Sequence, residues 1–162
     1  MILSHRSGGL VEDKSTDIAT NKKARFEYEI LETLEAGLVL VGTEVKSIRQ
    51  KKVSIGEAYA RIKGGEAFLV GMNVSVYDSG NRFNHDPARE RKLLLHRQEI
   101  KRLTGKLQER GLTLVPLKMY FKNGKVKLLL GLGKGKARYD KRKTIQKRES
   151  DREIQRIIKN RR

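Results

Sequence analysis

The dipeptide Asn123-Gly124 constrains this chain more than any other feature, because it favours a two-residue type I′ turn between antiparallel strands. A turn of this length fixes the register of both strands. The pairs it predicts are Lys122 with Lys125, Tyr120 with Lys127, Phe121 with Val126, and Met119 with Leu128. The first two pairs lie on one face of the hairpin and the last two on the other, so one face is cationic and the other belongs to a core.

The cationic face of this hairpin carries three lysines and an embedded tyrosine. Like charges that lie directly opposite each other are destabilising. The face therefore indicates that an anion normally lies nearby. A strand face that is simply solvated is the alternative interpretation.

Upstream of the hairpin, short segments alternate between apolar and polar residues. Apolar residues alternate with glutamates over 26–30, which predicts a strand with one buried face. Glu35-Ala36-Gly37 then predicts a turn into a second, more buried strand at 38–41. The mixed residues 1–19 predict a flexible leader, to which we assign no function, with order beginning at Phe26.

A second hairpin is predicted in the middle of the chain. Alternation over 58–63 and an apolar run at 67–70 flank the turn Gly64-Gly65. More strand is expected over 72–77. The polar residues 78–92 predict a long loop.

Two helices are expected. Val45 and Ile48 fall on one helical face, which predicts a short helix over 44–49 with Thr43 as its cap. Apolar residues at helical spacing over 100–107 predict a second helix that ends at Gly111.

Short strands with two helices and no internal repeat predict a mainly β fold, a small barrel of the oligonucleotide-binding type. A β-sandwich-like α+β domain is the alternative. The length of 162 residues suits one such domain with tails. We therefore divide the chain into the leader (1–19), an RNA-binding barrel domain (20–133) and a basic C-terminal tail (134–162).

Charge indicates the class of partner. The chain carries 37 Lys and Arg against 19 Asp and Glu, a net charge of +18, and an excess of this size points to nucleic acid. Thirteen basic and four acidic residues give the tail +9 of that charge. With few apolar side chains, the tail is expected to be disordered alone and helical when bound to RNA, with Ile154, Ile157 and Ile158 on one stripe.

Other functions find little support. The chain has no cysteine and no apolar run that approaches a membrane span, so we expect a cytoplasmic protein without metal, cofactor or membrane partner. Gly131, Gly133 and Gly135 lack the strand-turn-helix context of a phosphate-binding loop and instead predict a flexible exit from the last strand. His85-Asp86 is best explained as a pair of turn and cap groups, so no enzyme is expected.

Seven ordered segments are specific enough to indicate a family. They are 21–25 (NKKAR), 35–37 (EAG), 42–47 (GTEVKS), 81–87 (NRFNHDP), 91–96 (RKLLLH), 111–117 (GLTLVPL) and 140–142 (DKR). Together they resemble the small protein B family, the tmRNA-binding proteins of bacterial trans-translation. The resemblance runs from about Ile18 to the C-terminus.

This resemblance implies a barrel that grips the tRNA-like domain of tmRNA, as a monomer and one-to-one, and delivers it to ribosomes stalled without a codon in the A site. The RNA-facing residues that it implies are Asn21, Lys22, Lys23, Arg25, Glu35, Leu94, His96, Lys134, Lys136 and Arg138. A carboxylate such as Glu35 can accept hydrogen bonds from ribose hydroxyls or base amines, whereas Leu94 can pack on a sugar or base. A turn residue and a core residue are the respective alternatives.

The resemblance also assigns the tail to the ribosome. The tail would enter the empty mRNA channel of the small subunit and contact its RNA, with Asp140, Lys141 and Arg142 near the decoding centre. Tyr139 would stack on a base. Some family members carry a tail tryptophan that this chain lacks, so apolar anchoring would rest on the three isoleucines.

Three other functions are alternatives to this one: generic RNA binding, nuclease activity and binding to a membrane surface. A generic single-strand binder or ribosomal protein on the same barrel would bind many RNAs alike and lose affinity steeply with salt. A nuclease would need clustered carboxylates, and a membrane-surface protein would need bulky apolar residues beside the charge of the tail. The sequence lacks both patterns.

Overall fold

The turn at Asn123-Gly124 organises the observed sheet. In the computed structural model, which describes residues 16–79 and 84–161, these two residues have φ angles of +50° and +73°, as a type I′ turn requires. The turn joins β8 (Leu112–Lys122) to β9 (Lys125–Gly135). All four predicted residue pairs are present. On the predicted core face of the hairpin, Met119, Val126 and Leu128 are buried, and Phe121 is partly buried against the core.

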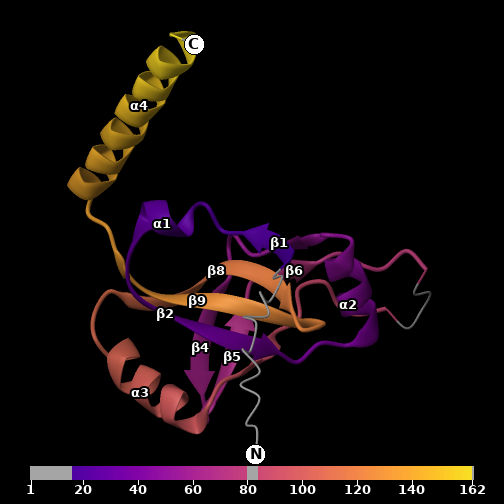
Figure 1. Cartoon of the computed structure of the whole chain (residues 1–162). Helices are drawn as coiled ribbons and strands as arrows, with labels where there is room; N and C mark the ends of the chain where they lie inside the picture. Colours follow the sequence, from indigo (N-terminus) through magenta and orange to yellow (C-terminus); the bar gives the residue numbers. More distant parts are fainter. Residues whose placement is uncertain (1–15, 80–83, 162) are drawn as a thin grey trace, which may run out of the picture.

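The remaining strands close this hairpin into a barrel. They are β1 (Thr16–Thr20), β2 (Tyr28–Leu38), β4 (Tyr59–Lys63), β5 (Glu66–Val70) and β7 (Arg91–Leu94). The strand order is β1-β8-β4-β5-β7-β2-β9, and the additional β8–β9 pairing closes the ring, with β1 beside β8 (Figure 1). The predicted mainly β barrel is therefore confirmed over the alternative sandwich. The small strands β3 (Val53–Ser54) and β6 (Asn73–Val74) pair separately.

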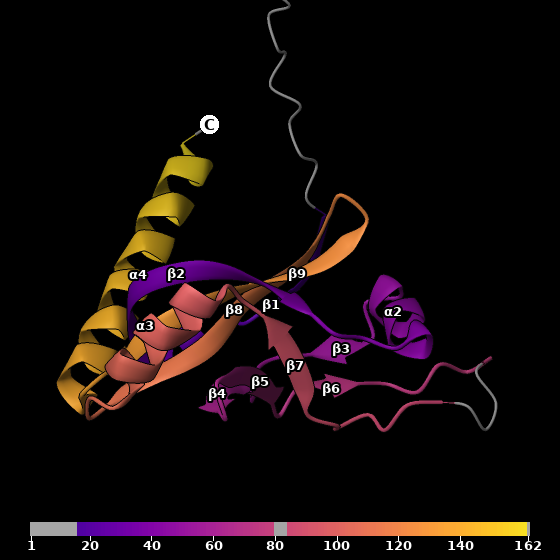
Figure 2. The ribbon, with the colours of Figure 1, turned by 90° about the horizontal axis from the view of Figure 1, so that it is seen from below.

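The described residues form four helices, which lie outside the barrel. They are α1 (Ala24–Glu27), α2 (Gly42–Arg49), α3 (Arg97–Leu107) and α4 (Arg138–Asn160). Two views at right angles place α3 and the base of α4 near one end of the barrel and α2 near the other (Figures 1 and 2). None of the helices among the described residues is both long and apolar enough to cross a bilayer.

The core fills the barrel with apolar side chains from nearly every strand and from α3. Its fully buried large residues include Leu69, Leu93, Leu103, Leu114, Met119, Leu128, Leu130 and Leu132. Leu103 is the buried residue of α3, which confirms the apolar face predicted for that helix. The helix ends at Leu107, however, and Gly111, with φ +79°, precedes β8 instead of capping α3.

The N-terminal half of the domain differs from the prediction. Residues 16–19, expected in the leader, belong to β1, because Ile18 is buried and the strand pairs with β8. The rest of the expected leader, residues 1–15, lies outside the described residues. Phe26 belongs to the single turn of α1, not to a strand.

The expected turn at Glu35-Ala36-Gly37 is also wrong, because all three residues lie inside β2. Gly37 allows a close approach between strands: a Cβ there would lie 3.2 Å from the Cβ of Leu94 on β7, so Leu94 would have to shift. The predicted strand at 38–41 is absent beyond Leu38, and the predicted strand at 72–77 is reduced to β6.

The glycines of β9 have a similar explanation. A Cβ at Gly131 would lie 2.9 Å from Cδ1 of Leu117, and one at Gly133 would lie 2.8 Å from the Cβ of Tyr28. They permit tight packing inside a strand, so the predicted flexible exit is wrong. β9 continues through Gly135, and the tail helix begins at Arg138.

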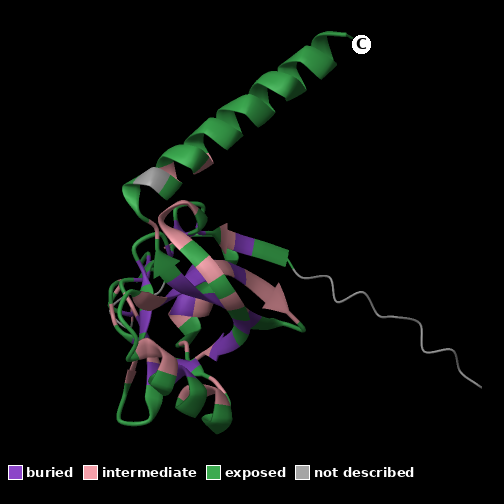
Figure 3. Ribbon diagram, turned by 90° about the vertical axis from the view of Figure 1, so that its left-hand side faces the viewer, coloured by how far each residue is buried: buried purple, intermediate pink, exposed green. Residues whose placement is uncertain are grey.

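The tail helix α4 projects from the barrel and is exposed over most of its length (Figure 3). The tail is thus helical over 23 residues, as its composition permits. The dependence of this helix on RNA stays a prediction.

Candidate RNA interface

The implied RNA-binding residues separate into two groups on the structure. Glu35, Leu94 and His96 line one groove on the barrel. The others lie around α1 and where β9 leads into α4; they are Asn21, Lys22, Lys23, Arg25, Lys134, Lys136 and Arg138. The fold thus gathers residues that are far apart in the chain, and it places them in two separate regions of the surface.

The first groove has a volume of about 920 Å³ and lies between β2, β7, the start of α3 and the tip of the β8–β9 hairpin. Its apolar lining residues, here called the apolar wall, include Leu38, Leu40, Val45, Leu94 and Leu95. Its polar wall includes Glu35, His96, Arg102, Lys125 and Lys127. A groove lined by both apolar side chains and cations suits RNA, because a base or sugar can pack on the apolar groups while phosphates contact the cations.

Leu94 is the most exposed part of the apolar wall, with 53% of its surface accessible. It sits on β7 directly opposite Gly37 of β2. Because Gly37 has no side chain, Leu94 extends over the strand pair. The alternative of a buried core residue is therefore wrong for this leucine.

Glu35 is held in place by the hairpin. Its Oε2 accepts a short hydrogen bond from the hydroxyl of Tyr120 and a longer one, 3.5 Å, from Nζ of Lys122. The bond from Tyr120 and the charge of Lys122 hold the pKa of this carboxyl below its ordinary value. Burial and the Glu35 carboxylate raise the pKa of Tyr120, which keeps its hydroxyl protonated as a donor.

Glu35 is an anion beside the cationic face of the hairpin, where the sequence indicated that one lies nearby. The chain itself supplies an anion beside Lys122. Within the described part of the chain, Lys125 and Lys127 make no ion pair, and both line the groove. The remaining positive charge on this face is thus directed toward the groove.

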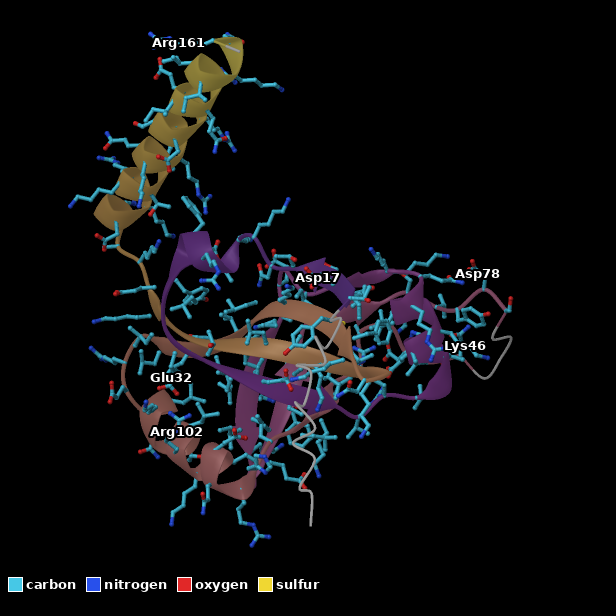
Figure 4. The ribbon with its side chains drawn as sticks, in the orientation of Figure 1. Asp17, Glu32, Lys46, Asp78, Arg102 and Arg161 are labelled. Carbon is cyan, nitrogen blue, oxygen red and sulfur yellow. The ribbon has the colours of Figure 1, made fainter. Side chains whose placement is uncertain are left out.

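The wall formed by α3 is fixed by Glu32 of β2. Its carboxylate accepts hydrogen bonds from Arg102 (2.5 Å) and Lys106 (2.6 Å), both on α3, and Figure 4 shows Glu32 facing Arg102. The bond from Lys106 is the main reason that the pKa of Glu32 is lowered. This clamp ties the middle and the last turn of α3 to β2. At the start of α3, the exposed His96 precedes the helix and donates its backbone N–H to Glu99 (2.9 Å).

Asn21 is mainly structural in the second group. It is buried, and its amide donates to the carbonyl oxygens of Pro116 (2.9 Å) and Ile55 (3.4 Å). Its Oδ1 accepts the N–H of Ala24 (3.1 Å) at the start of α1. Asn21 thereby fixes the position of α1, and its contact with RNA stays a prediction.

The cations of α1 differ in how they are paired. Lys23 is bound to Glu57 at 2.9 Å and lies 3.8 Å from Glu27, and the hydrogen bond to Glu57 raises its pKa. Lys22 and Arg25 are exposed and make no ion pair within the described residues. These two side chains are the ones available to an anion.

Lys136 connects the barrel to the tail. Its Nζ donates to the backbone oxygen of Arg25 (3.1 Å) and to Oγ1 of Thr144 on α4 (3.2 Å). Lys134 and Arg138 on either side of it are exposed. Of the three predicted exit cations, Lys136 is therefore engaged within the protein.

The tail residues lie along α4. Asp140, Lys141 and Arg142 occupy its first turns, and the side chain of Tyr139 lies outside what the structure describes. The three predicted anchors Ile154, Ile157 and Ile158 are 49–57% exposed. They contact no part of the barrel's core cluster.

A buried ionic network that the sequence did not predict supports the loop preceding β7. Glu44 of α2 and Arg91 of β7 are both fully buried, with Arg91 Nε 3.0 Å from Glu44 Oε1. Arg89 adds bonds of 2.6 and 2.8 Å to the same carboxylate. Burial alone would raise the pKa of Glu44, but the bonds from Arg89 and Val41 and the charge of Arg91 hold it below its ordinary value. Residues 47 positions apart leave no periodic signal, so this pair was not detectable.

The same loop gives His85 a structural place. Its ring bonds Oγ1 of Thr43 and the carbonyl oxygen of Val74, both at 2.9 Å. The prediction that Thr43 caps α2 is therefore wrong, because its hydroxyl bonds His85. At the start of α2, Glu44 instead accepts the N–H of Val41 (3.1 Å). The described residues contain no group of three or more His, Asp or Glu that could hold a metal ion.

This chain is similar to known proteins over most of its length. The model of the family described as SmpB protein matches residues 18–160. An SsrA-binding protein of Acetivibrio thermocellus is 56% identical over 150 residues, which cover 93% of this chain and 97% of that protein. One of Anoxybacillus flavithermus is 58% identical over 144 residues, 89% and 94% of the two chains.

A solved structure is also similar. It is described as "tmRNA-SmpB: a journey to the center of the bacterial ribosome", and it matches with a TM-score of 0.63 and 49% identity. The match covers 78% of this chain and 93% of that chain.

Proposed function

Because this chain belongs to the SmpB family, we propose that it binds tmRNA through its barrel and delivers it to stalled ribosomes. The observation that carries this function is the groove in which Glu35, Leu94 and His96 meet. It combines an exposed apolar wall, a fixed carboxylate and unpaired lysines. These groups can contact the bases, riboses and phosphates of a folded RNA.

The finer assignments follow from the same family resemblance. The barrel grips the tRNA-like domain as a monomer, one protein to one tmRNA. The tail enters the vacant mRNA channel, with Asp140, Lys141 and Arg142 at the decoding centre. The protein works by binding, without catalysis, and its work on ribosomes places it in the cytoplasm.

Competitive binding tests this function. The tRNA-like domain of tmRNA competes with an unrelated folded RNA of equal length for the full-length protein, at about 0.15 M salt, where exposed charge is already screened. We expect a strong preference for the tRNA-like domain. Equal binding of the two RNAs would leave only a basic barrel with another RNA partner.

A further inference from the structure

A second basic groove lies where the tail meets the barrel. It has a volume of about 410 Å³ and is bounded by α1 with the residues before it, by β8 and β9, and by α4. Its cations are Lys22, Arg25, Lys118, Arg148 and Arg152. Its other lining residues are Thr20, Asn21, Leu117 and Leu129, so no carboxylate lies among the described residues that line it.

The groove exists because the base of α4 packs on α1 (Figure 1). The Arg148 guanidinium lies 5.7 Å from the centre of the Phe26 ring, within the range of a cation–π contact. The Lys136 backbone N–H donates to the oxygen of Glu27 (2.9 Å), and its side chain bonds Thr144. Arg148 and Arg152 are four residues apart on one helix, so both face the groove.

The charges around this groove are largely uncompensated. Lys118 has a partner, Asp17, at 2.8 Å. Within the described part of the chain, Lys22, Arg25, Arg148 and Arg152 have no carboxylate partner. Cations gathered this closely repel one another, and the repulsion is relieved when a polyanion binds and releases its counterions.

We propose that this groove binds backbone phosphates of the RNA, with Arg148 and Arg152 of the tail helix completing a site that Lys22, Arg25 and Lys118 begin on the barrel. The inference rests on the proposed function, because the RNA is the same tmRNA. It adds a contact made jointly by barrel and tail. RNA bound there stabilises the direction in which α4 leaves the barrel, so capture of the RNA also orients the tail.

Two double variants of the full chain test this site. Arg148→Gln with Arg152→Gln removes the tail half of the groove. Lys147→Gln with Arg161→Gln removes the same charge from the tail outside the groove, and Figure 4 shows Arg161 at the far end of α4. Glutamine keeps a high helix propensity, and circular dichroism checks that α4 is retained.

The readout is affinity for the tRNA-like domain across salt concentrations. Each lost phosphate contact lowers the slope of log K against log salt by about one unit. We expect the groove variant to lose about one to two units of slope and about tenfold in affinity, with the control close to wild type. Equal losses in both variants would overturn the site.

Arg152→Gln alone distinguishes a lost phosphate contact from a loss of packing between α4 and α1. Arg152 does not contact Phe26 of α1 in the described structure, so its replacement leaves that packing in place. We expect this variant to lower the slope by about one unit. An unchanged slope would show that the groove binds no phosphate. If wild-type protein failed to prefer the tRNA-like domain over an unrelated folded RNA, the proposed function itself would fail, and the two failures are thereby distinguished.

Discussion

At the scale of single residues, the supporting loop depends on one buried carboxylate. Glu44 accepts bonds from Arg89, Arg91 and the backbone of Val41. Arg91 in turn donates to the backbone oxygens of Met72 and Arg89. A buried ion pair contributes little net stability relative to an apolar pair, but removing one partner leaves an uncompensated charge in the interior.

Glu44→Gln should therefore lower the free energy of unfolding by about 3–5 kcal/mol, measured by urea denaturation at neutral pH. The folded-state pKa of Glu44 lies below its ordinary value, so its contribution is present above the unfolded pKa and is lost as the pH falls through the folded pKa. The difference from wild type should shrink in acid. Glu57→Gln, at an exposed pair with Lys23, is the control and should change little. Equal effects of the two variants would contradict the network's role.

Leu94 offers a residue-scale test of the first groove. Leu94→Ala should weaken binding of the tRNA-like domain about fivefold, through the loss of about 1 kcal/mol of apolar burial. Leu31→Ala is the matched control, because Leu31 is also 53% exposed but does not line the groove. Filter binding or fluorescence anisotropy measures both. A comparable loss with Leu31→Ala would mean that the effect is not specific to the groove.

At the scale of elements, β9 shows how glycine adjusts strand packing. Gly133 and Gly135 lie two residues apart on the same strand. A side chain at Gly133 would collide with Tyr28, whereas one at Gly135 meets nothing within 4 Å. Both positions therefore lie in the same strand, but only Gly135 has room for a side chain.

Gly133→Ala should destabilise the barrel by about 1–3 kcal/mol, because the overpacked strand must shift away from β2. Gly135→Ala should leave the melting temperature unchanged or slightly raised. Thermal unfolding followed by circular dichroism measures both variants. If Gly133→Ala melted at the wild-type temperature, the close approach to Tyr28 would not constrain the strand.

At the scale of the whole molecule, local chemistry predicted most of the barrel. The type I′ turn, the Gly64-Gly65 hairpin and the apolar face of α3 were correct, because each depends on residues close in sequence. Glycines 37, 131 and 133 were misread as turn or hinge residues, since their function depends on side chains that tertiary pairing brings near. Sequence patterns cannot show such neighbours.

The candidate site was predictable to a similar degree. Family resemblance supplied Glu35, Leu94 and His96, which the fold does bring into one groove. It did not show that Asn21 is buried or that Lys136 holds the tail. Those roles depend on packing between α1, β8 and α4, which spacing along the chain does not encode.

The proposed function assigns RNA binding and ribosome rescue to different parts of the chain. Asp140, Lys141 and Arg142 lie at the start of α4 and outside both grooves. Their joint replacement by alanine should leave affinity for tmRNA nearly intact, because none of the three residues lines either of the proposed RNA-binding grooves. It should abolish release of ribosomes stalled on a truncated messenger in a reconstituted translation reaction.

The matched control replaces Glu153, Arg156 and Lys159 by alanine, which removes one acidic and two basic residues from the same helix. This variant should retain more rescue than the first, since the proposed function assigns residues 140–142, and not these three, to the decoding centre. A large loss of tmRNA affinity in the first variant would refute the division of labour. Equal loss of rescue in both would show that α4 acts through its overall charge, and the specific position of residues 140–142 would then carry no function of its own.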